Sequence, residues 1–492
     1  MIVIYIKNHK FHYEIENLCR VFFPYRKIIV KTCKKVIEPL NDYICTEIIE
    51  KENKSSLIVR AKINSTDYFQ EGNVEKVREN YESECERVLA VLLFNILCKA
   101  TGILPPWGIL TGVRPIKLMR KLLNELGAEK ALNYFKEKLL VSDQKAKLSF
   151  NIANVQKKIL DLSTPKSFSL YVSIPFCPTR CSYCSFVSQS VEKSNKLIPE
   201  YLMFLLKELE YTGMIIEKLG LKLETVYIGG GTPTTLNADE LKILIEKIYS
   251  SFNMKTCREF TVEAGRPDTI TREKLKVLKA LKVTRLSINP QTLNDKTLEE
   301  IGRRHTANQA IEAFNMAREC GFKNINMDLI VGLPGEVYND FVFTLEKVCK
   351  LNPENITIHT LAIKRAASLM REENSLKNKQ AEIVSNMLDF ANTQLYQNNY
   401  FPYYLYRQSK MLGNFENIGW AKENFENYYN IHIMEETHSV ISCGAGGVTK
   451  LKDPYSDYIE RVYNFKFAYE YITRFDEIIF RKDKVLMFYD KL

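Results

Sequence analysis

A regular alternation of apolar strands and amphipathic helices begins near Ser167 and does most to constrain the fold of this 492-residue chain. Strands that alternate with helices predict a parallel sheet with helices packed on it. The predicted strands are 170–174, 225–228, 260–263, 285–288, 326–331 and 357–361, and the helices between them include 201–219, 238–250, 272–281 and 307–319. Six such units are enough for a partial β/α barrel, although eight are needed to close one fully.

Sequence on either side of this alternation predicts two further regions. Near the N-terminus, strand-like runs at 1–6 and 56–63 mix with helical stretches, one of which is opened by Pro115. After the alternation, a helix at 383–397 leads into an aromatic stretch and a small-residue turn at 444–447. The predicted organisation is an α+β domain at 1–165, a partial barrel at 166–375 and an accessory domain covering the barrel mouth at 376–492.

Three of the chain's 12 cysteines are clustered directly after the first predicted strand. They are Cys177, Cys181 and Cys184. Pro175 and Pro178 exclude a regular helix, so the cysteines lie on a loop that can wrap a metal group. Three thiolates suit an iron–sulfur cluster with one iron open to a further ligand. A zinc site is the rival interpretation, but the nearest downstream residues that could complete it are Cys257 and His305.

The cysteine loop and the segments after it resemble a known superfamily. Cys-x3-Cys-x-aromatic-Cys, with Tyr183 as the aromatic, resembles the signature of the radical S-adenosylmethionine (SAM) enzymes. The frame YxxIPFC…CxYCxF, with GGGTPT, RLSINPQT, GRRH and MDLIVGLPGE, is similar to the oxygen-independent coproporphyrinogen III oxidase family over about 167–447. The runs TGILPPWGILTGVRPIKLM and YYLYRQSKMLGN resemble its HemZ-type coproporphyrinogen dehydrogenases in particular.

The resemblance implies a partial (β/α)6 radical SAM barrel that holds a [4Fe–4S] cluster on the three cysteines and SAM beside it. It also implies that the amino and carboxylate groups of SAM chelate the open iron. The residues that it assigns to SAM are Tyr171, Tyr183, Gly230, Gly231, Thr232, Glu263, Gln291, Arg303, Asp328 and Ala362. Since Gln291, Arg303 and Asp328 match residues that hold a second SAM in the oxidase, the number bound, one or two, stays open.

The reaction implied by the resemblance is radical decarboxylation in haem biosynthesis. Reductive cleavage of SAM gives a 5′-deoxyadenosyl radical, and an electron donor that the sequence does not identify must supply the electron. The implied substrate is coproporphyrinogen III, two of whose propionates become the vinyl groups of protoporphyrinogen IX. The net charge of +10 suits a substrate with four carboxylates. Lys364, Arg365 and Arg407 are candidate partners for these carboxylates.

Two residues depart from the pattern of the oxidases. Phe186 stands where those enzymes have a fourth cysteine, and Ser173 stands where they have a histidine. Phe186 is what haem chaperones of the HemW type show, so a haem-binding delivery protein is the alternative hypothesis. A third hypothesis, RNA modification, rests on basic charge alone, and nucleic acid is not an expected partner.

The remaining patterns concern the cellular location. The first residues, MIVIYIKNHKF, lack the pattern of a signal peptide. The most apolar segment, 88–98, is shorter than the roughly 20 residues that cross a membrane. We therefore expect a soluble cytoplasmic protein without a membrane span.

Overall fold

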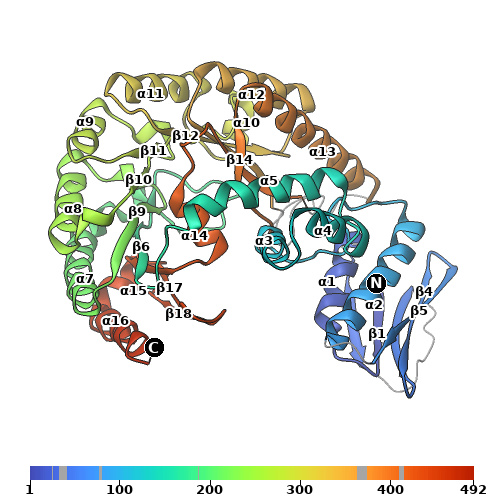
Figure 1. Ribbon diagram of the computed structural model, residues 1–492. Coiled ribbons are helices and arrows are strands. Elements are labelled where there is room, and N and C mark those ends of the chain that lie inside the picture. The colour runs from blue at the N-terminus through green and yellow to red at the C-terminus, as the bar shows by residue number, and fades with distance from the viewer. Residues whose placement is uncertain are drawn as a thin grey trace. The chain divides into compact units, whose positions relative to one another are not determined.

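The computed structural model describes residues 1–24, 26–32, 42–76, 80–186, 188–362, 374–408 and 415–491. The chain forms two compact units, coloured by residue number in Figure 1. Of the described residues, the first unit contains 1–153, 374–377, 407 and 408, and the second contains 154–362, 378–406 and 415–491. The boundary at Ala153 falls inside helix α5 (Asp143–Leu160).

The first unit has a mixed five-stranded sheet in the order β2-β1-β3-β4-β5. The strands are β1 (Ile2–Lys7), β2 (Ile28–Thr32), β3 (Tyr43–Glu50), β4 (Lys54–Ile63) and β5 (Thr66–Glu75), and the helices include α1 (His12–Phe22), α2 (Tyr81–Thr101), α3 (Pro115–Leu126) and α4 (Ala128–Asn133). Apolar side chains of α1 and α2 share one buried core with the sheet. The strands expected at 1–6 and 56–63 and the helix opened by Pro115 are confirmed.

The second unit is built on a mostly parallel sheet, so a mixed α/β fold is confirmed. Its strand order is β14-β15-β13-β12-β11-β10-β9-β6-β16-β17-β18, and the run from β13 to β16 is parallel. The parallel strands are β6 (Ser167–Ile174), β9 (Lys222–Gly230), β10 (Glu259–Glu263), β11 (Arg285–Ser287), β12 (Ile325–Val331), β13 (Asn355–Thr360) and β16 (Ser439–Cys443). All six predicted strands are present, and the sequence did not predict β16, which adds beside β6.

The helices between these strands lie along the outer side of the sheet (Figure 1). They are α7 (Ile198–Leu219), α8 (Ala238–Ser251), α9 (Arg272–Ala280), α11 (Ala307–Glu319) and α12 (Tyr338–Leu351), and the short helix α10 (Asp295–Glu300) precedes α11 in the chain. Reciprocal side-chain to backbone hydrogen bonds start α8 at Asn237 with Glu240 and α11 at Thr306 with Gln309. Each of these helices therefore starts where its sequence specifies a cap.

The C-terminal residues extend the same sheet within the second unit. The added elements are α13 (Asn374–Gln397), β14 (Phe401–Tyr406), β15 (Asn417–Ala421), α14 (Tyr428–Glu435), β17 (Val448–Lys452), β18 (Ile459–Tyr463), α15 (Ala468–Thr473) and α16 (Phe475–Tyr489). Figure 1 shows α14 on the inner side of the curved sheet. Most described residues after 376 fall in the same compact unit as the parallel strands. The domain boundaries expected at 165 and at 375 stay predictions.

The segment before α14 is anchored at the amino-terminal ends of β10 and β11. Glu259 accepts hydrogen bonds from the backbone N–H groups of Tyr428 and Tyr429, at 3.1 and 3.2 Å. Arg285 pairs with Glu259 at 3.2 Å and donates to the carbonyl oxygen of Phe425 at 2.8 Å. This anchor leaves the carboxyl-terminal ends of the strands, where β/α proteins build active sites, to the cysteine loop.

Candidate functional site

The cysteine loop leaves the carboxyl end of β6 and is fixed by backbone contacts. Cys177 ends the short strand β7 (Phe176–Cys177), which pairs with β8 (Gln189–Ser190). The N–H of Cys184 donates to the carbonyl of Cys181 at 3.2 Å, which closes a tight turn. Thr179 Oγ1 donates to the carbonyl of Gly302 at 2.7 Å, so the loop is also tied to the segment before Arg303.

The glycine run after β9 packs directly against the base of this loop. The N–H groups of Gly231 and Thr232 donate to the carbonyls of Ile174 and Phe176, both at 2.7 Å. A Cβ on Gly231 would lie 2.5 Å from the Phe176 oxygen, so a side chain does not fit there. Thr232 Oγ1 lies 3.4 Å from Cys177 Sγ as a donor. Gly231 and Thr232, which are predicted to contact SAM, therefore also position the cysteine loop through these contacts.

Glu263, at the end of β10, lies beside a cluster of tyrosines. Tyr227 Oη donates to Glu263 Oε1 at 2.5 Å. Burial raises the pKa of Glu263 to about 7, and the hydrogen bond from Tyr227 opposes this rise. The rings of Tyr171 and Tyr429 stack with that of Tyr227, with centroids 6.1 and 4.4 Å away. The site therefore combines a partly buried acid with aromatic faces, a setting that suits a sulfonium cation.

Gln291, in the segment after β11, and Asp328, within β12, are joined through their backbones. The N–H of Gln291 donates to the carbonyl of Asp328 at 2.9 Å, and Gln291 has a φ of +70°. Burial tends to raise the pKa of Asp328, but hydrogen bonds from His359 and Asn326 hold it below its usual value. Gln291 Oε1 is buried without a protein partner among the described residues, so it is available to a ligand.

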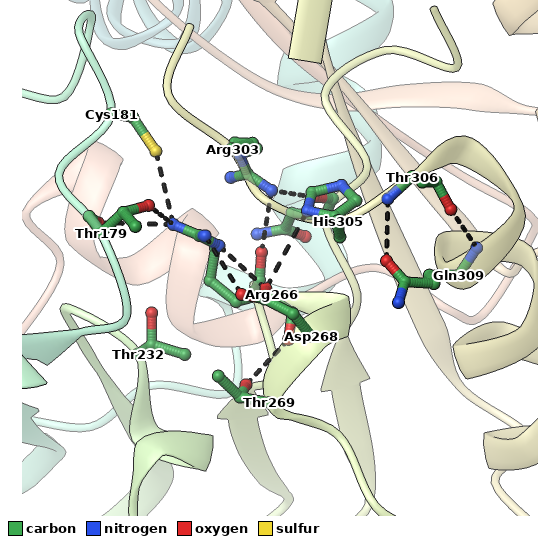
Figure 2. A network of polar contacts seen from close by, with 12 residues as sticks. Thr179, Cys181, Thr232, Arg266, Asp268, Thr269, Arg303, His305, Thr306 and Gln309 are labelled. Atoms are coloured by element: carbon green, nitrogen blue, oxygen red, sulfur yellow. Dashed lines mark hydrogen bonds and ion pairs between the residues drawn. The ribbon is translucent and has the colours of Figure 1, made fainter. Parts of the chain in front are cut away.

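Arg303 belongs to the polar network shown in Figure 2. It also connects Tyr183 with the segments after β10 and β11. Its Nη1 donates to the carbonyls of Asn289 and Gly265, at 2.6 and 3.2 Å, and its Nε donates to Tyr183 Oη at 3.2 Å. Arg303 and Tyr183, both assigned to SAM by their motifs, therefore touch each other. Ala362 follows β13 at the same edge of the sheet.

The side chains at this edge fit an anionic cluster and an amino-acid cofactor. The guanidinium of Arg266 lies against the loop, with Nη1 3.7 Å from Cys181 Sγ. In the described part of the chain, no three Cys, His, Asp or Glu side chains converge to hold one metal ion. A [4Fe–4S] cluster instead distributes its thiolates over separate irons. Glu263 and the unpaired Gln291 oxygen offer acceptors for an amino group and a hydroxyl.

Comparison with known proteins places the chain in a family. The sequence model of the Radical SAM superfamily matches residues 171–348. The chain is 40% identical over 407 residues to the oxygen-independent coproporphyrinogen-III oxidase-like protein HemZ of Bacillus subtilis, over 82% of this chain and 81% of that protein. The chain belongs to the radical SAM superfamily, among the HemZ-like proteins. Membership implies a [4Fe–4S] cluster and SAM.

The chain is also similar to a haem chaperone and to a protein of solved structure. The chain is 39% identical over 197 residues to the haem chaperone HemW of Bacillus subtilis, which covers 40% of this chain and 50% of that protein. A solved structure described as the coproporphyrinogen III oxidase HemN of Escherichia coli aligns with a TM-score of 0.49 and 23% identity, over 66% of this chain and 73% of that one. Among the described residues, no helix is long and apolar enough to cross a bilayer.

None of these contacts involves the candidate carboxylate partners. Lys364 and Arg365 lie outside the described residues. Arg407 belongs to the first unit, where its Nη1 donates to the carbonyl of Leu110 at 2.5 Å and its guanidinium lies 5.4 Å from the Trp107 ring. Its role toward substrate stays a prediction.

Two residues of this HemZ-like site were not found from the sequence. Arg266 comes three residues after Glu263 in the run GRPDT. Because it is a charged residue just after a predicted strand, it could have been predicted as a site residue. Tyr429 comes from α14, about 200 residues after Tyr227 in the sequence, and only the packing of that helix reveals it.

Proposed function

We propose that this chain is an oxygen-independent coproporphyrinogen III oxidase that converts two propionates of its substrate to vinyl groups, giving protoporphyrinogen IX. The observation that carries the proposal is the 40% identity over 82% of the chain to HemZ, which bears the name of an oxidase-like protein. A partial (β/α)6 barrel and a cytoplasmic location belong to the same proposal.

In this proposal Cys177, Cys181 and Cys184 hold the cluster on a loop that the glycine run keeps in place. When bound, the reduced cluster and SAM supply a radical that abstracts hydrogen from an unactivated carbon. Glu263, as the carboxylate, accepts a hydrogen bond from the SAM amino group, and the negative charge of the carboxylate strengthens such a bond. The stacked rings of Tyr171 and Tyr227 give the cofactor an aromatic wall.

Asp328 of β12 and Gln291 after β11 complete the cofactor pocket in this proposal. Asp328, held in its charged form by His359 and Asn326, accepts from ribose hydroxyls. The unpaired oxygen of Gln291 accepts a further donor. Lys364, Arg365 and Arg407 remain proposed partners of the substrate carboxylates, which are anions that arginine binds well.

A haem chaperone is the second candidate, and Phe186 favours it. This side chain follows the third cysteine by two residues and is 64% exposed. The 39% identity to HemW over 197 residues points the same way. A chaperone would bind haem stoichiometrically and leave coproporphyrinogen III unchanged.

The deciding experiment is an anaerobic incubation of the reconstituted protein with coproporphyrinogen III, SAM and a reductant. Chromatography of the oxidised porphyrins measures the products. The proposal expects vinyl products from the wild type and from Cys257→Ala, a matched control outside the loop, but none from Cys184→Ala. Formation of 5′-deoxyadenosine without any vinyl product would refute the oxidase. Stoichiometric haem uptake in the same preparation would then support the chaperone.

A further inference from the structure

Arg266 is buried against the cysteine loop although no cofactor role has been assigned to it. Only 3% of the residue is exposed. Its Nη1 lies 3.7 Å from Cys181 Sγ and 3.0 Å from Thr179 Oγ1, as Figure 2 shows. Nη1 of Arg266 therefore donates to both the Cys181 sulfur and the Thr179 hydroxyl of the same loop.

The orientation of this guanidinium is built into the fold. Asp268 accepts from Nε at 3.1 Å and from Nη2 at 3.3 Å, a bidentate pair that fixes the guanidinium plane. Thr269 Oγ1 donates to the Arg266 carbonyl at 2.8 Å, and Thr234 holds the Thr269 hydroxyl at 2.6 Å. With Asp268 on one edge, the remaining edge of Arg266 faces Cys181.

The groups around Arg266 leave its positive charge only partly compensated. Asp268 contributes one negative charge, and Arg303 adds a second positive charge beside Tyr183. His305, 4.0 Å from Asp268, adds none near neutral pH, because burial and the nearby Arg303 lower its pKa to about 4. Within the network of Arg266, Asp268, Arg303 and His305, two charged arginines therefore stand against one carboxylate.

We propose that Arg266 is a positioning residue that donates a hydrogen bond to the Cys181 thiolate and raises the reduction potential of the [4Fe–4S] cluster. This inference rests on the proposed function, since it requires the cluster on this loop. Hydrogen bonds to cluster sulfurs and net charge near a cluster both set its potential. A donor to the thiolate and a nearby positive charge both favour the more negative, reduced cluster.

The test is an anaerobic redox titration with dithionite, followed by electron paramagnetic resonance (EPR), on reconstituted full-length protein. Arg266→Gln removes the charge, and the reduced-to-oxidised ratio at the wild-type midpoint is expected to fall about tenfold, equivalent to about 59 mV for one electron. Asp268→Asn keeps the guanidinium and removes the carboxylate charge, so the ratio is expected to rise. Arg266→Lys keeps the positive charge but loses the planar guanidinium with its paired N–H donors. Its reduced-to-oxidised ratio is expected to lie between those of Arg266→Gln and the wild type.

The matched control is Arg258→Gln, which breaks a partly buried pair with Glu224 at the other end of β10 and is expected to leave the ratio unchanged. Iron and sulfide content is measured for each variant. Shifts of Arg266→Gln and Asp268→Asn in opposite directions support the inference, since loss of structure alone would not produce them. An unchanged ratio in Arg266→Gln, or loss of the cluster from both Arg266 variants, overturns it. A wild type that assembles no cluster instead overturns the proposed function.

Discussion

The phenol of Tyr227 donates a 2.5 Å hydrogen bond to Glu263, across the carboxyl ends of two neighbouring parallel strands. The Glu263 side chain is partly buried, and a Cβ on Gly229 would lie 3.1 Å from its Oε2, so a larger residue at position 229 requires its neighbours to shift. Burial raises the pKa of Glu263 to about 7, so its charge changes within the physiological range.

Binding of SAM is expected to depend on the ionisation of Glu263. The charged carboxylate is the stronger hydrogen-bond acceptor for the SAM amino group, so affinity in the wild type rises between pH 6 and pH 8. Glu263→Gln is expected to lose about tenfold to a hundredfold in affinity at pH 8, the value of a hydrogen bond to a charged group. Isothermal titration calorimetry at several pH values checks this. An equal pH slope in wild type and Glu263→Gln contradicts the role of Glu263.

The same group affects the stability of the protein without SAM. Its pKa is raised on folding, so the folded state binds the proton more tightly, and stability is lost as pH rises from about 4.5 to about 7. Glu263→Gln has no carboxyl group to titrate and does not lose this stability. The unfolding free energy of the variant minus that of the wild type is therefore expected to be about 2 to 3 kcal/mol larger at pH 8 than at pH 5. Denaturant unfolding at both pH values measures the difference. A constant difference contradicts a raised pKa.

Gly231→Ala is expected to displace the cysteine loop, because the added Cβ would lie 2.5 Å from the Phe176 carbonyl oxygen. Iron content after reconstitution is expected to fall to a minor fraction of wild type. Gly112→Ala is the control, since no atom lies within 4 Å of its added Cβ. Full iron content in Gly231→Ala shows that the glycine run does not position the loop.

The sequence predicted much of the second unit because its information is local. The six parallel strands follow from short apolar runs between amphipathic helices, and Cys177 is placed by the prolines beside it. β16 and Tyr429 were not predicted, since each meets its partner more than 200 residues away in the sequence. Contacts between residues so far apart in the sequence depend on chain topology, which the periodicity of apolar residues does not encode.

Arg285 also illustrates a contact that the strand pattern alone does not reveal. The side chain lies in the interior and joins Glu259 on β10 to the segment before α14. Arg285→Met leaves the buried Glu259 charge without its partner and is expected to cost about 3 to 5 kcal/mol of unfolding free energy. The shift of the denaturant midpoint measures this cost.

Two companion variants test that explanation. Adding Glu259→Gln to Arg285→Met is expected to recover part of the loss, because the stranded charge is removed. Arg272→Ala, which breaks an exposed pair with Glu319, is expected to leave the midpoint unchanged. A midpoint for Arg285→Met equal to that of wild type shows that the anchor of α14 does not depend on this pair.

The central claim is that Cys177, Cys181 and Cys184 hold a cluster with one iron open to SAM. The most direct measurement is the EPR spectrum of the reduced, reconstituted protein before and after SAM is added. We expect SAM to change the cluster spectrum in the wild type and in Cys257→Ala, and we expect Cys181→Ala to show no cluster spectrum. A wild-type cluster whose spectrum is the same with and without SAM would contradict the claim.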